Sequence, residues 1–132
     1  MPESVSPLFN DATIRSLKLT MEASAARHNA LASNIANVST PGYKRMDLDP
    51  AYQTSFERTL QQIQEGQTVP FATKPVIAED KTASKGDLDG NNVNLDHELP
   101  ELMKNSTNFE FASRLLAKQY NAIHTAITGR SV

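Results

Sequence analysis

The sequence predicts a mainly α-helical protein with a long N-terminal helix and a long C-terminal helix, each with a coiled-coil-like apolar face. Apolar residues recur at helical spacing over residues 11–38 and again over 94–129. The stretch between them is polar and rich in turn-forming residues. Val, Ile, Leu and Phe together number only 29 of the 132 residues, a small core for a solitary globule. We therefore expect a partner or an assembly to supply part of the burial.

The first helical pattern follows a lead-in of residues 1–10. Asn10 and Asp11 are both suited to cap its start. The Pro41-Gly42 pair stops the pattern, because proline and glycine both end helices. The packing seam of this helix repeats at spacings of three and four and contains Ile14, Leu17, Met21, Leu31, Ile35 and Val38.

The middle segment, residues 46–93, differs in character from both ends. Pro50 suits the first position of a short helix over about 51–65, which Gly66 ends. Residues 67–93 are expected to form an extended, loop-rich stretch. Apolar residues near its start suit one or two short strands or an extended loop, and these are Val69, Phe71, Val76 and Ile77.

The second long pattern covers residues 94–129, and Gly129 is a natural C-terminal cap. Pro100 is tolerated only in a first helical turn, so regular helix is expected to begin as late as 97–99, with Leu95 in an extended lead-in. The seam of this helix contains Leu102, Phe109, Leu116, Tyr120, Ile123 and Ile127.

Small and polar residues interrupt both seams: Ser24 and His28 in the first, Ser106 and Ser113 in the second. One interpretation is a loose antiparallel helix pair with ordinary imperfections. The other is that small seam residues let helices from several subunits pack closely. Periodicity leaves both interpretations open.

Composition argues against several other classes of protein. The net charge of −2 and the scattered basic residues give no footprint for nucleic acid. No apolar stretch approaches the roughly 20 residues that span a bilayer. The chain has no cysteine, and its three histidines lie far apart in sequence. No carboxylate pair or phosphate-binding loop is apparent, so the sequence predicts no enzyme and no catalytic, cofactor-binding or metal-binding residue.

One segment carries a long and specific motif. Residues 32–43 read Ala-Ser-Asn-Ile-Ala-Asn-Val-Ser-Thr-Pro-Gly-Tyr. This closely resembles the N-terminal signature of the flagellar basal-body rod and hook proteins, and residues 88–96 and 116–129 resemble the proximal-rod members of that family. Residues 67–86 match nothing diagnostic. The signature positions are Asn34, Ile35, Ala36, Asn37, Thr40, Pro41, Gly42 and Tyr43.

The resemblance implies a structural subunit of the bacterial flagellar proximal rod, assembled helically around the export channel. It also implies that residues 11–45 and 94–129 pair as a coiled-coil-like inner domain, with residues 46–93 outside it. Such a subunit transmits torque from the membrane ring toward the distal rod and hook. The implied partners are copies of itself, other rod proteins of the FlgC, FlgF and FlgG types, the rod-ring adaptor of the FliE type, the MS ring and the flagellar export gate. The implied location is the periplasmic part of the basal body, reached through flagellar type III export without a cleaved signal peptide.

Two other classes remain as alternatives to the rod subunit. A soluble helical adaptor or export chaperone of the flagellar secretion system would stay in the cytoplasm. A wall hydrolase would need a carboxylate pair or a metal triad, which the sequence does not show.

Overall fold

The computed structural model describes residues 11–69 and 74–129, and it is mainly helical, as predicted. The elements in chain order are α1 (Asp11–Ala36), β1 (Met46–Leu48), α2 (Pro50–Gln64), β2 (Ile77–Glu79) and α3 (Leu95–Thr128). The predicted lead-in, residues 1–10, lies outside the described residues, as does Phe71.

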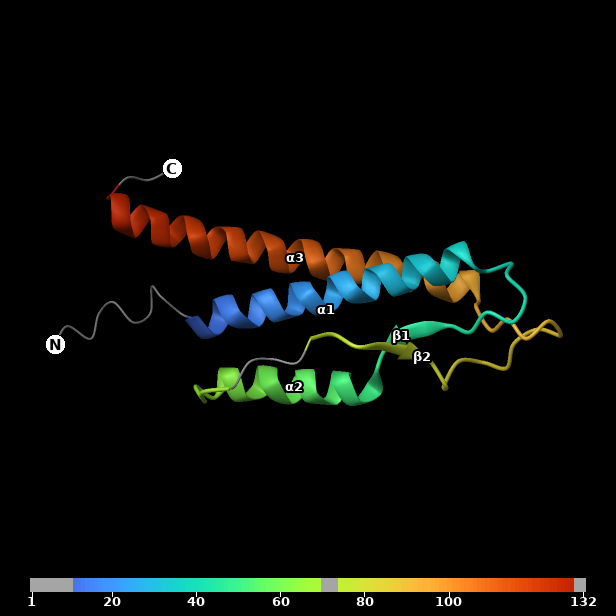
Figure 1. Cartoon of the computed structure of the whole chain (residues 1–132). Coiled ribbons are helices and arrows are strands. Elements are labelled where there is room, and N and C mark those ends of the chain that lie inside the picture. The colour runs from blue at the N-terminus through green and yellow to red at the C-terminus, as the bar shows by residue number, and fades with distance from the viewer. Residues whose placement is uncertain (1–10, 70–73, 130–132) are drawn as a thin grey trace.

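The two long helices run antiparallel, side by side (Figure 1). Contacts show the direction, because Ser24 of α1 bonds Asn105 of α3, whereas Asn34, further along α1, bonds Glu98 near the start of α3. At 1.5 Å per residue, the 26 residues of α1 span about 39 Å and the 34 residues of α3 about 51 Å. The start of α1 and the end of α3 therefore lie at the same end of the molecule.

The short helix and the sheet cover the other side of α1, so α1 lies between α3 and α2 in Figure 1. The two strands pair antiparallel, with Asp47 opposite Ala78. The Asp49 carboxylate caps α2 by accepting from the backbone N–H groups of Ala51 and Tyr52. Helix α2 buries Tyr52 and Ile63.

Two features differ from the sequence-based expectation, namely the start of α3 and the presence of β1. Helix α3 begins at Leu95 rather than at 97–99, because the Asn94 side chain accepts from Asp96 N and caps the helix there. Pro100 consequently lies inside the helix. Its missing N–H leaves the carbonyl of Asp96 without a helical partner, and both residues are exposed to water. Strand β1 was not predicted, because its three residues carry no period long enough to detect.

The buried apolar core is small and centres on α1. Leu31 is completely buried. The other buried apolar side chains are Leu19, Ala23, Ala30, Tyr52, Ile63 and Ala112. Several polar side chains are equally buried, and they define the site described next.

Candidate functional site

The motif forms the turn that leads the chain out of α1. Gly42 has φ = 75°, which glycine adopts without the strain other residues meet there. Asn34 is fully buried, and its side chain pairs with both backbone polar groups of Met46, at 2.8 and 2.9 Å. Its Oδ1 also accepts from the Tyr43 hydroxyl at 3.2 Å. Asn34 therefore fastens the end of α1 to the first strand.

Asn91, in the loop that precedes α3, holds the turn that follows α1. Its side-chain Nδ2 lies 2.9 Å from the carbonyl oxygen of Asn37, 3.1 Å from that of Val38 and 2.8 Å from that of Thr40. These three carbonyls belong to the turn after α1, so the amide fixes the path of the chain beyond the end of the helix. The loop that precedes α3 is thereby tied to the motif turn.

A cluster of charged side chains joins α1, the sheet and α3. We call it the arginine cluster, and its members are Arg27, Arg45, Asp47, Asp80, Glu98 and Glu101. Arg45 is its centre: it donates to Glu98, to Asp80 at 2.6 Å and to Asp47 at 3.0 Å. Arg27 donates to Asp47 at 2.8 and 3.0 Å and to Glu101 at 2.8 Å.

The cluster is strongly desolvated at its centre, where the side chain of Arg45 is 6% exposed and that of Glu98 is 0% exposed. Buried ions are tolerated only when they are paired and hydrogen-bonded. Asn34 adds a further hydrogen bond to Glu98 at 3.1 Å. In the described residues no buried side-chain nitrogen or oxygen lacks a hydrogen-bond partner.

Hydrogen bonds and ion pairs shift the pKa values of Asp47, Asp80 and Arg27 in the cluster. Burial by itself would raise the pKa of Asp47, but the hydrogen bonds from Arg27, Leu48 N and Arg45 outweigh it and lower the pKa. The pKa of Asp80 is also lowered: burial acts against this, and hydrogen bonds from Thr82 and Arg45 prevail. The hydrogen bond to Asp47 raises the pKa of Arg27. All these shifts favour the charged forms, so the cluster is suited to holding segments together rather than to exchanging protons.

The predicted seam residues divide into two groups. Leu31 is buried, and Ile14, Leu17, Met21, Leu102, Leu116 and Ile123 are partly covered. Three others are exposed, at 37% for Phe109, 45% for Tyr120 and 72% for Ile127. The line of α3 that is fully buried runs instead through Glu98, Asn105 and Ala112.

Sequence reasoning missed this line because two of its three members are polar. The Asn105 side chain of α3 donates to the backbone oxygen of Ser24 at 2.7 Å. The small seam residue Ser24 is therefore a point of contact between α1 and α3. Arg45, Asp47 and Asn91 were also missed. The signal available in the sequence was the seven-residue spacing of Glu98, Asn105 and Ala112, which an apolar-only search cannot detect.

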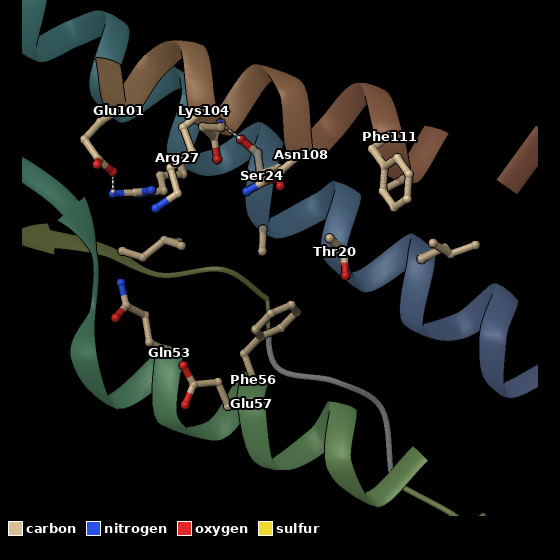
Figure 2. A pocket seen from close by; sticks show the side chains of 15 residues that line it. Thr20, Ser24, Arg27, Gln53, Phe56, Glu57, Glu101, Lys104, Asn108 and Phe111 are labelled. Atoms are coloured by element: carbon tan, nitrogen blue, oxygen red, sulfur yellow. Dashed lines mark hydrogen bonds and ion pairs between the residues drawn. The ribbon is translucent and has the colours of Figure 1, made fainter. Parts of the chain in front are cut away.

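A groove lies between α2 and α3, with α1 as its floor (Figure 2). Its volume is about 650 Å³. Phe56 of α2 and Phe111 of α3 face it from opposite walls, and Thr20, Ala23 and Ser24 form a floor of small residues. Asn108, Glu57 and Lys104 supply polar and charged groups.

Nothing in the described ranges, 11–69 and 74–129, gathers three metal-ligating side chains, and no helix there is long and apolar enough to cross a membrane. Long antiparallel helices that are tied at one end by polar contacts and that expose apolar side chains are suited to packing against other helices.

Comparison with known proteins specifies the class further. A family model described as "Flagella basal body rod protein" matches residues 14–44. The flagellar basal body rod protein FlgB of Cereibacter sphaeroides is 31% identical over 113 residues, covering 78% of this chain and 84% of the relative. The FlgB proteins of Aquifex aeolicus (30% over 112 residues; 80% and 84%) and Bacillus subtilis (25% over 125 residues; 89% and 94%) are also similar.

The chain belongs to the flagellar basal-body rod protein family, which confirms the resemblance seen in the motif. It is a structural subunit of the basal-body rod, and the adaptor alternative is not favoured. The relatives that match are structural flagellar rod proteins. Assembly with other basal-body components follows from membership of the family.

Proposed function

We propose that the chain is a proximal-rod subunit that assembles helically around the export channel and transmits torque from the membrane ring toward the distal rod and hook. The arginine cluster is the observation that carries this proposal. It joins α1, the sheet and α3 through charged hydrogen bonds, which are shorter and stronger than neutral ones. Torque transmission needs rigid helices whose relative position is fixed, and the cluster supports that fixed position.

We further propose that residues 11–45 and 94–129 form an inner domain and that residues 46–93 lie outside it. The exposed seam residues of α3 support this division, because apolar side chains such as Ile127 gain burial when a neighbouring subunit packs against them. Assembly then stabilises each subunit by mass action. The whole predicted seam, Ile14, Leu17, Met21, Leu31, Leu102, Phe109, Leu116, Tyr120, Ile123 and Ile127, serves packing within or between subunits.

The partners in this proposal are copies of the chain, rod proteins of the FlgC, FlgF and FlgG types, a FliE-type rod-ring adaptor, the MS ring and the export gate. The location is the periplasmic part of the basal body, reached by flagellar type III export without a cleaved signal peptide. The motif turn sets the direction in which the chain leaves the inner domain.

Fractionation of the host bacterium tests the proposal. A tagged chain that restores motility to a deletion strain should be recovered in purified basal bodies, at the cytoplasmic-membrane end of the rod in density maps. Ile127→Asp should abolish motility, whereas Lys81→Asp, in the exposed loop after β2, should leave it unchanged. Recovery of the functional chain only in the cytoplasm would support an adaptor or chaperone instead.

A further inference from the structure

The two edges of the small sheet differ in whether their outward backbone groups are bonded. We propose that the outer edge of β2 binds an extended segment of a different protein, which adds a third, antiparallel strand. The segment carries an apolar residue opposite Ile77 and a basic residue opposite Glu79. This inference goes beyond the proposed function and does not depend on it.

The hydrogen bonds beside the strands show which backbone groups of β2 point away from β1. Asp49 N donates to Val76 O at 2.8 Å. Backbone bonding alternates along an antiparallel strand, so every second residue of β2, counted from Val76, bonds β1. Ile77 and Glu79 lie between these bonded positions. They therefore direct their N–H and C=O groups away from β1, and we call these four groups the free edge.

The corresponding groups of β1 are already bonded by side chains. The Asn34 amide bonds both the N–H and the C=O of Met46, at 2.9 and 2.8 Å. Leu48 N donates to the carboxylate of Asp47 at 2.8 Å. Asn34 and Asp47 thereby oppose the addition of a strand beside β1, so the sheet is open to extension at β2 instead.

The free edge of β2 has no comparable closure. Within residues 11–69 and 74–129, its four groups form no hydrogen bond, and the main packing partners of β2 are β1 and α1 (Figure 1). Unpaired N–H and C=O groups in a row are a template for another strand. An extended main chain bonds all four groups at once, which is how peptides are recognised by strand addition.

The side chains along the free edge specify which extended segment fits. Asp47 points toward Arg27 of α1, so Ile77 and Glu79 lie on the opposite face of the sheet, because neighbouring residues alternate. Leu48 lies directly opposite Ile77 on that face, and an apolar residue on the added strand would continue this apolar row. Glu79 is exposed and forms no ion pair with the described part of the chain, so a basic residue opposite it gains one. Cross-strand pairs of both kinds stabilise sheets.

The same side chains disfavour a second copy of the chain as the occupant. An antiparallel pair of two β2 strands bonds all four groups of each free edge only when Ile77 of each copy lies opposite Glu79 of the other. That register sets an apolar side chain against a carboxylate twice and provides no ion pair. Charged residues on an edge strand commonly protect it from self-association. A different protein with a basic residue two positions before an apolar one meets both requirements.

Peptide binding to the purified full chain tests the proposal. The probe is a blocked peptide, Ser-Thr-Lys-Thr-Val-Thr-Ser, whose lysine is designed to lie opposite Glu79 and whose valine is designed to lie opposite Ile77. With millimolar peptide, hydrogen exchange followed by NMR should slow at the N–H groups of Ile77 and Glu79. It should stay unchanged at Met46 N–H, which Asn34 already bonds.

N-methylated peptides are matched controls for backbone recognition. A methyl group on the nitrogen of the lysine or the valine removes a proton that bonds β2, so it should weaken binding about tenfold. A methyl group on the threonine between them should leave binding unchanged, because that N–H points away from β2. Equal binding of all three methylated peptides would show that the free edge is not the binding site and would overturn the proposal.

Charge reversal tests the side-chain requirement. Glu79→Lys should weaken binding of the lysine peptide about threefold and strengthen binding of a peptide with glutamate in that place. Glu57→Lys, at an exposed position on α2, should change neither. No response to reversal at Glu79 would overturn the proposed specificity for a basic residue.

Exchange in the free chain tests the other occupants of the edge. Slow exchange at Ile77 and Glu79 at every dilution would mean that the chain covers its own edge. Slow exchange that increases with chain concentration would mean that a second copy occupies it. Either result overturns the proposal, as does the absence of any slowing by the peptide.

Discussion

The two ends of the α1–α3 pair are held in different ways. At the end that carries the motif, Asn34, Arg45, Asn91 and Glu98 connect four segments that are distant in sequence, and each of them is almost completely buried. At the other end, the last two turns of α3 present Ile127 to solvent and make none of these connections. Figure 1 shows the helices diverging toward that end.

The difference indicates that the two ends of this helix pair have different roles. Directional polar contacts specify a unique geometry when they are fully satisfied, and they are concentrated at the motif end. Apolar contacts are less specific but gain most from added burial, and the open end keeps such surface available. One end fixes the shape of the subunit, and the other supplies the surface proposed for its neighbours.

The largest expected effect comes from removing the centre of the arginine cluster. Arg45→Ala leaves Glu98 buried without its guanidinium partner, which should lower the free energy of unfolding by about 3–5 kcal/mol. Urea denaturation followed by circular dichroism measures the change. The matched control is Arg114→Ala, which removes an exposed pair with Glu110 and should cost less than about 0.5 kcal/mol. Similar losses for both variants would contradict a stability difference between the two ends.

The next largest effect is expected at Asn34. Asn34→Ala removes the hydrogen-bond partners of both backbone groups of Met46 and should cost about 1–3 kcal/mol for each group left buried and unpaired. Hydrogen exchange at Met46 N–H should accelerate accordingly. Asn121→Ala, on an exposed face of α3, is the control and should change stability by no more than about 0.5 kcal/mol. Unchanged protection at Met46 would show that Asn34 does not fasten the strand.

Acid should weaken the motif end first. The pKa of Asp47 is lowered from its ordinary value of 3.8 in the folded protein. Its contribution to stability is therefore complete above about pH 4 and is lost as the pH falls through the folded value. Unfolding monitored between about pH 5 and pH 2 should show this loss, with a shallower dependence in Asp47→Asn. The same pH dependence of stability in both proteins would show that Asp47 does not cause the loss.

A smaller effect is expected at the motif turn. Gly42→Val forces a β-branched residue to φ = 75°, although the added side chain meets no neighbour within 4 Å. Backbone strain alone should cost about 1–3 kcal/mol, and rod assembly should fail more often than in Lys81→Ala. Swimming in soft agar compares the two strains. Equal motility would contradict the placement of Gly42 at a structurally demanding turn.

The smallest effect on the free chain is expected at the open end. Ile127→Ser should change the stability of the monomer by no more than about 0.5 kcal/mol, because the side chain is already 72% exposed. Thermal melts of purified chain measure this. A loss above about 2 kcal/mol would mean that the open end is packed within the monomer and that the comparison is wrong.

The sequence was sufficient to predict both long helices, the short helix with Pro50 at its start, and the motif turn, because periodicity and capping residues act locally. It was insufficient for β1 and for the buried face of α3. Glu98 and Asn105 are buried because Arg45 and Ser24 satisfy them, and those partners are 53 and 81 residues away. No local pattern encodes a contact over such a separation. Helix α3 begins earlier than Pro100 predicts, because the Asn94 side chain caps the helix before Leu95.

The long sequence separations within the arginine cluster have a consequence for the order of folding. The ion pair of Arg45 forms only when Glu98 is in place, and that of Arg27 only when Glu101, 74 residues away, is in place. Pairings of such range close late, since the entropy of the intervening loop is lost before any contact compensates it. Whichever terminus leaves a narrow conduit first, the chain therefore cannot complete the motif end until most of its length has emerged. The contacts that fix the finished subunit form late, so they do not obstruct the passage of the unfolded chain.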